Sequence, residues 1–108
     1  MKNSHLLAVL CFLGATSAFA ATPQANWDEL CAKCHGPDGK GQTKMGKKLS
    51  IGDFTDAKAQ EKFTDDQAFE AMKKGITDKS GKTSMKPIEG LSDEDMKAMI
   101  PFVRAFKK

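Results

Sequence analysis

The feature that most constrains this 108-residue chain is a pair of cysteines followed at once by a histidine, in Cys31-Ala32-Lys33-Cys34-His35. Side chains three positions apart in a helix lie on the same face, so both thiols can reach one bound group. The imidazole of His35 adds a strong metal ligand beside them. The pentapeptide therefore predicts a helical turn that binds a single metal-containing group.

This spacing is typical of c-type haem attachment. Each thiol can add to one vinyl group of a haem, and His35 then lies beneath the iron as its proximal ligand. A thioredoxin-like redox pair would need a preceding strand and a βαβ setting, and the sequence shows no convincing strand. A structural zinc site would need four ligands. Two buried structural cysteines are the remaining alternative. We predict one covalently bound haem c, held by Cys31, Cys34 and His35.

The N-terminus predicts export. Lys2 precedes an uncharged apolar run over residues 6–13, and small residues end in Ala18-Phe19-Ala20, which is the layout of a secretory signal peptide. These eight apolar residues are far fewer than the roughly 20 that span a bilayer. Acylation at Cys11 would give a lipoprotein, but this cysteine lies within the apolar run. We predict a signal peptide at 1–20, a single domain at 21–108, no stable membrane insertion and a periplasmic location.

Removing 20 residues leaves 88, which suffice for one small core. A domain of this size often needs a disulfide, a metal or a cofactor to supplement that core. The whole chain has 17 Lys and Arg against 14 Asp and Glu, and loss of Lys2 leaves a formal charge of only +2. This weak positive charge gives no support to nucleic-acid binding.

Three main helices are predicted, over 26–34, 64–75 and 92–108, with a shorter one over 56–62. The first places both cysteines on one face with Trp27 and Leu30. The last carries Pro101 within its apolar stripe, where we expect a bend because proline removes a helical hydrogen bond. Alternating strand patterns are absent, so the fold class is all-α.

The chain resembles the class I c-type cytochromes over essentially all of residues 21–108. Trp27 stands four residues before Cys31, where that family usually has an aromatic residue, and Gly36, Gly39 and Gly41 are similar to its glycine-rich turn. Phe102-Val103-Arg104 is similar to its aromatic-Val-Arg ending. The resemblance implies a cytochrome c fold wrapped around one haem, with the terminal helices crossing near one haem edge.

The distal ligand is predicted to be Met85, because it lies outside a helical pattern in a loop that could present its thioether to the iron. The family resemblance agrees, since its ligand methionine typically lies between the middle and last helices, often with a proline close behind. Met45, in the loop after His35, is the alternative. Met72, Met96 and Met99 fit helical faces and are expected to fill the core. Lysine ligation stays open.

His/Met ligation fills both axial positions of the iron, which favours electron transfer over binding or activating oxygen. We therefore predict a monomeric, soluble one-electron carrier and not an enzyme. A cytochrome c subunit of a larger respiratory or dehydrogenase complex is the alternative, and a five-coordinate sensor or peroxidase-like protein is a third.

Two groups of lysines are candidates for steering an acidic redox partner toward the haem edge. They are Lys33, Lys40, Lys44, Lys47 and Lys48 after the attachment motif, and Lys79, Lys82 and Lys86 around the proposed ligand loop. Many class I relatives also carry a later Gly-Pro pair whose carbonyl accepts the ring proton of the proximal histidine. This chain has no clear equivalent, so the acceptor for His35 stays open.

Overall fold

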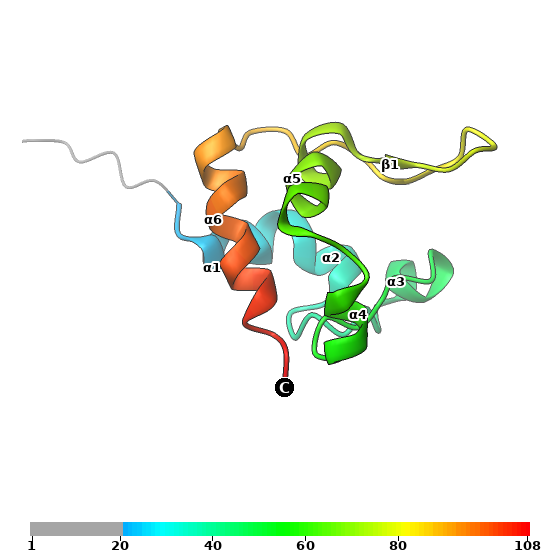
Figure 1. Cartoon of the computed structure of the whole chain (residues 1–108), viewed down its shortest axis with the longest axis horizontal. Coiled ribbons are helices and arrows are strands. Elements are labelled where there is room, and N and C mark those ends of the chain that lie inside the picture. The colour runs from blue at the N-terminus through cyan, green and yellow to red at the C-terminus, as the bar shows by residue number, and fades with distance from the viewer. Residues whose placement is uncertain (1–20) are drawn as a thin grey trace, which may run out of the picture.

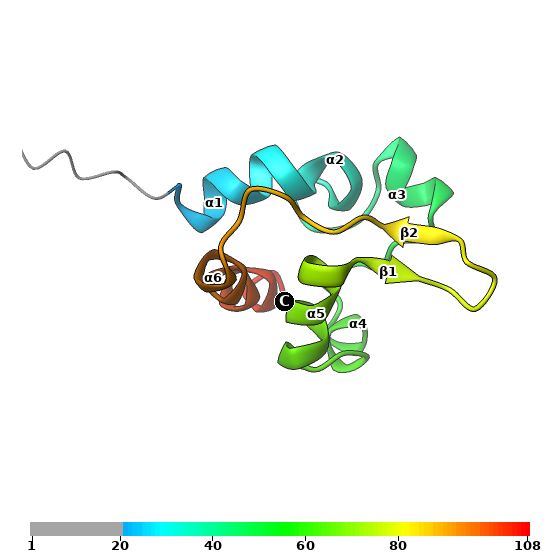
Figure 2. The same ribbon diagram turned by 90° about the horizontal axis from the view of Figure 1, so that it is seen from above.

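The computed structural model describes residues 21–108, so the predicted signal peptide lies outside the described residues. Most of the regular structure in this part is helical. The helix α6 (Asp93–Arg104) lies against both α1 (Pro23–Asn26) and α5 (Asp65–Lys74), as Figures 1 and 2 show. No helix within 21–108 is long and apolar enough to cross a membrane.

The N-terminal helical segment runs from α1 through a π-helical turn, η1 (Trp27–Cys31), into α2 (Ala32–His35). The N–H of Ala32 donates to the carbonyl of Trp27, five residues back. The predicted helix over 26–34 is therefore present, but its α-helical spacing is interrupted by this turn. The wider turn takes up one extra residue, and Leu30 is 36% exposed while Trp27 is 1% exposed.

The predicted middle and last helices are confirmed, because their local end signals are strong. Thr64 forms a capping box with Gln67 at the start of α5, and Ser92 forms one with Asp95 at the start of α6. The last helix is shorter than predicted and ends at Arg104. Pro101 lies inside α6, and the bend expected there stays a prediction.

Two short helices flank the central part of the chain. The predicted short helix is present as α4 (Ala57–Glu61), with Asp56 as its N-cap. The helix α3 (Lys44–Lys48) was not predicted. It begins where the Thr43 hydroxyl accepts a 2.9 Å hydrogen bond from the N–H of Gly46, a single turn that leaves no apolar periodicity in the sequence.

A small antiparallel hairpin contradicts the expectation that strands are absent. It pairs β1 (Ile76–Thr77) with β2 (Thr83–Met85) and projects from the helical body in Figures 1 and 2. Its turn is held by Asp78, whose Oδ1 accepts hydrogen bonds of 2.9 Å from the N–H groups of Ser80 and Lys82. Strands of two and three residues are too short to show alternation in a sequence.

The protein core is small. Within residues 21–108 the buried large apolar side chains are Trp27, Met72, Met96 and Met99, which we call the core cluster. A larger set of apolar side chains packs against this cluster and stays partly exposed: Cys31, Ala32, Phe54, Phe69, Met85, Ile88, Leu91, Ile100, Phe102, Val103 and Phe106. The polypeptide alone therefore leaves much of its apolar surface incompletely covered.

Candidate functional site

The two predicted attachment cysteines lie in the N-terminal helical segment, Cys31 at the end of η1 and Cys34 within α2. Both are half-buried free thiols, and Cys31 packs against the core cluster. Burial, with a smaller contribution from Cys34, raises the pKa of Cys31 to about 11, so this thiol is protonated at neutral pH. Within residues 21–108 no three His, Cys, Asp or Glu side chains gather into a metal-binding group.

The predicted proximal ligand, His35, ends α2 with its ring among aromatic side chains. It stacks on Phe54 with ring centroids 4.9 Å apart, and its centroid lies 5.6 Å from that of Trp27. Burial lowers the pKa of His35 and favours the neutral imidazole, which is the form that binds metals.

The Nδ1 atom of His35 is buried and has no hydrogen-bond partner among the described residues. A buried polar atom without a partner costs about 1–3 kcal/mol, so native structures rarely keep one without a reason. A histidine retained only for packing would be expected to have hydrogen bonds at its ring nitrogens. Packing alone therefore does not account for His35 at this position.

The loop after His35 folds back tightly on the N-terminal helical segment. The indole N–H of Trp27 donates a 3.0 Å hydrogen bond to the carbonyl of Gly36, and the N–H of Gly41 donates to the carbonyl of His35. Gly39 has φ +72, and a Cβ there would lie 2.9 Å from the ring of Phe106. Glycine at this position lets Phe106, two residues after the end of α6, pack closely over the loop.

The structure separates the two candidate distal methionines. Met85 is half-buried and packs against the same core cluster as Cys31, whereas Met45 on α3 is 40% exposed. Met85 lies outside any helix, as predicted, but it ends the strand β2 opposite Ile76 and is not in a loop. Met45 instead lines an open hollow of about 330 Å³ with Lys33, Lys44 and Lys48.

These residues fit a covalently held haem. Two free thiols and a half-buried imidazole belong to the same helical segment, and a broad set of partly exposed apolar side chains surrounds an undersized core. A large apolar group bound there would cover that surface and complete the core. Cys31 and Cys34 would hold it through thioethers, with His35 and Met85 available to the iron.

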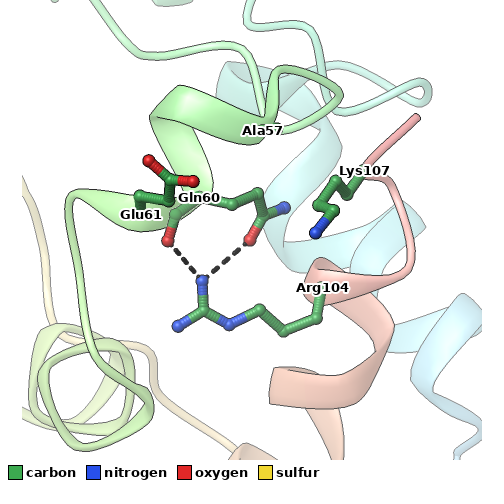
Figure 3. Close-up of a pocket in the computed structure, with 5 residues that line it drawn as sticks. All are labelled: Ala57, Gln60, Glu61, Arg104 and Lys107. Atoms are coloured by element: carbon green, nitrogen blue, oxygen red, sulfur yellow. Dashed lines mark hydrogen bonds between the residues drawn. The ribbon is translucent and has the colours of Figure 1, made fainter.

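A polar network that the sequence analysis missed fixes one side of this site. Gln60 on α4 is 4% exposed, and its amide N–H₂ group donates to the carbonyls of Phe54 and Val103 at 2.8 and 2.9 Å. Figure 3 shows the guanidinium of Arg104 turned toward the backbone and side-chain oxygens of Gln60. The network thereby ties α6 to Phe54, which stacks on His35.

The hollow beside this network has a volume of about 410 Å³ and a mixed lining of Ala57, Gln60, Glu61, Arg104 and Lys107. Arg104 also donates to the carbonyl of Phe63 at 2.8 Å and to the carboxylate of Asp65 at 3.0 Å. Its donors are thus already used within the protein, and the hollow contains none of the predicted haem-binding residues. The hydrogen bonds that line this hollow favour a structural role for Gln60 and Arg104.

We expect Arg104→Ala to lower the free energy of unfolding of the haem-loaded protein by about 3 kcal/mol, since it leaves buried oxygens of Gln60 without a charged donor. Chemical denaturation followed by circular dichroism measures this loss. Lys107→Ala, at the rim of the same hollow, is the control and should stay within about 0.5 kcal/mol of the wild type. Equal stability of the two variants would contradict the structural role of Arg104.

Comparisons with known proteins agree with this geometry. A family model described as Cytochrome c matches residues 20–107. A solved structure described as KustC0563 c-type cytochrome is similar at a TM-score of 0.69 and 32% identity, over 82% of this chain and 100% of that one. A structure described as a Kustc0563 mutant is similar at a TM-score of 0.66 and 32% identity, over 81% of this chain and 100% of that one. No curated protein matches this chain.

Proposed function

The chain belongs to the cytochrome c family, and from that premise we propose that it carries single electrons on one haem c, held by Cys31 and Cys34 and ligated axially by His35 and Met85. Membership of the family implies the covalent haem and the electron-carrier role, and it confirms the predicted cytochrome c fold. One observation carries the proposed ligand set: Cys31 and Met85, 54 positions apart, pack against the same core cluster.

When bound, the haem supplies an iron that gains or loses one electron. Cys31 and Cys34 would hold the haem by adding their S–H groups across its vinyl groups, each forming a carbon–sulfur bond while its hydrogen goes to the adjacent vinyl carbon. His35 offers a neutral imidazole because its burial disfavours the charged form. Phe54 and Trp27 flank its ring and restrict access of water from their sides.

Ligation by both His35 and Met85 would leave the iron without a position for substrate, which is why we propose a carrier and not an enzyme. We also propose that the carrier is free and monomeric. Its large exposed apolar side chains within 21–108 are Leu30, Met45 and Ile76, and they lie on three separate elements. A permanent subunit would be expected to present a contiguous apolar patch, and copurification from native membranes tests that alternative.

The covalent attachment is tested on protein made in an export-competent host. We expect acid-acetone extraction to leave the colour on the polypeptide. Intact mass spectrometry should give a chain that starts near Ala21 and carries the mass of one haem. This result would also support the proposed cleavage of residues 1–20 and export to the periplasm. Extractable haem would refute the attachment, and a retained, acylated Cys11 would place the protein on a membrane.

We further propose that the lysines around Met45 form the docking face for an acidic redox partner. Lys33, Lys44 and Lys48 surround this exposed thioether. The face adjoins the attachment motif, because α3 packs on α2 and the Thr43 hydroxyl donates a 2.6 Å hydrogen bond to the carbonyl of Cys34. Positive charge here would draw an acidic partner toward the side of the haem that Cys31 and Cys34 would hold.

We expect Lys33→Glu/Lys48→Glu to slow oxidation of the reduced protein by ferricyanide several-fold at low ionic strength, because the anion then meets negative charge near the haem. The cationic oxidant tris(phenanthroline)cobalt(III) should react faster with the same variant. Stopped-flow absorbance at several salt concentrations measures both rates. Lys79→Glu/Lys82→Glu makes the same change in net charge around the hairpin turn and is the control. Equal effects of the two variants would refute a localised docking face.

A further inference from the structure

The segment that carries Met85 rests on the C-terminal end of α5. The N–H of Ile88 donates a 2.8 Å hydrogen bond to the carbonyl of Met72, in the last part of that helix. Met85 itself pairs in the hairpin with Ile76, which directly follows the cap residue Gly75. The backbone is thus held near the C-terminal end of α5 at Met85 and again at Ile88.

The segment that carries Met85 comes very close to the end of α5 at Gly75. A Cβ on this residue would lie 2.5 Å from the carbonyl oxygen of Met85 and 2.9 Å from Cδ of Pro87. Both separations are shorter than real side chains tolerate, and one of them involves backbone that cannot rotate away. Gly75 also has φ +76, which disfavours any residue with a side chain. The absence of a side chain therefore lets two segments meet at this point.

The other glycines near this region differ in that respect. Gly81 in the hairpin turn and Gly90 before α6 both have φ +86, yet a Cβ on either would meet nothing within 4 Å. At Gly81 and Gly90 the lack of a side chain is required only by the local turn. At Gly75 it is required by the turn and also by the contact with the backbone of Met85.

We infer that Gly75 is the positioning residue for the distal ligand: it lets the backbone of Met85 lie against the end of α5 and so sets where the thioether enters the core. This inference rests on the proposed ligation by Met85. The hairpin alone would not hold that position, because its strands have two and three residues and are almost entirely exposed. A site placed by rigid supporting contacts is sensitive to a displacement of a fraction of an ångström.

The experiment compares Gly75→Ala with Gly81→Ala in the haem-loaded protein. Both substitutions place a side chain at positive φ, but only the first pushes on Met85 and Pro87. We expect Gly75→Ala to lose most of the weak far-red absorption of methionine-ligated ferric haem and to raise the affinity for carbon monoxide at least tenfold. Its reduction potential should fall, and its covalent haem should remain. Gly81→Ala should behave as the wild type in all of these measurements.

Equal spectra and carbon monoxide affinities for the two variants would overturn the inference. If Met85→Ala leaves the far-red absorption intact, the proposed ligand itself is wrong, which is a separate failure. Should Gly75→Ala not accumulate with haem, Gly75→Ala/Pro87→Gly decides, because it frees the segment after Met85 to move away. Recovery of haem without the far-red absorption supports the inference. Recovery of the haem together with the far-red absorption overturns it, and so does failure to recover the haem.

Discussion

Replacement of both Cys31 and Cys34 by alanine is expected to make the haem fully extractable by acid-acetone and to destabilise the protein severely. The core cluster has four buried side chains, so the fold depends on the bound group to cover its remaining apolar surface. A ligand present at 1,000 times its dissociation constant contributes about 4 kcal/mol, and loss of a tethered haem is expected to cost on that order. Thermal unfolding of the purified variant, with haem quantified in the same sample, measures both effects.

The single variants Cys31→Ala and Cys34→Ala are the matched controls. Each keeps one thiol, so each should retain haem through one thioether and lose less stability than the double variant. The comparison separates the tether from the packing of the side chains. Haem that stays on the polypeptide of the double variant after extraction would contradict attachment through these cysteines.

Met85→Ala is expected to open one axial position of the iron. The half-buried thioether packs against the core cluster, and a methyl group in its place cannot reach a metal. The weak far-red absorption of the ferric protein should disappear, and the reduction potential should fall because methionine ligation raises it. New binding of carbon monoxide should follow. Visible spectra, a redox titration and a carbon monoxide titration measure these changes while the covalent haem remains.

Met45→Ala is the control for this substitution. Met45 is 40% exposed among lysines and lies outside the core cluster, so its removal should change none of the three measurements. If the two variants exchange these behaviours, Met45 is the ligand. If the wild type already binds carbon monoxide readily, the carrier function gives way to a sensor or a peroxidase-like enzyme.

The structure departs from the sequence-based predictions at short local irregularities and where distant parts of the chain bond to one another. The π-helical turn before Cys31 exposes Leu30, although the α-helical pattern had placed it with Trp27. Gln60 bonds to Val103, 43 positions away, and nothing in the sequence near α4 indicates that partner. The acceptor for the ring proton of His35 was left open by the sequence, and the described residues supply none.

The sequence by itself determined the features that depend on neighbouring residues. The motif that ends at His35 predicts its chemistry from spacing alone, and Thr64 and Ser92 start their helices because each bonds a backbone N–H three residues on. Only the tertiary structure shows that Met85, and not Met45, packs against the core cluster, and that a side chain at Gly75 would meet the backbone of Met85. Those outcomes depend on packing between segments far apart in the chain, and periodicity in a sequence carries no information about such contacts.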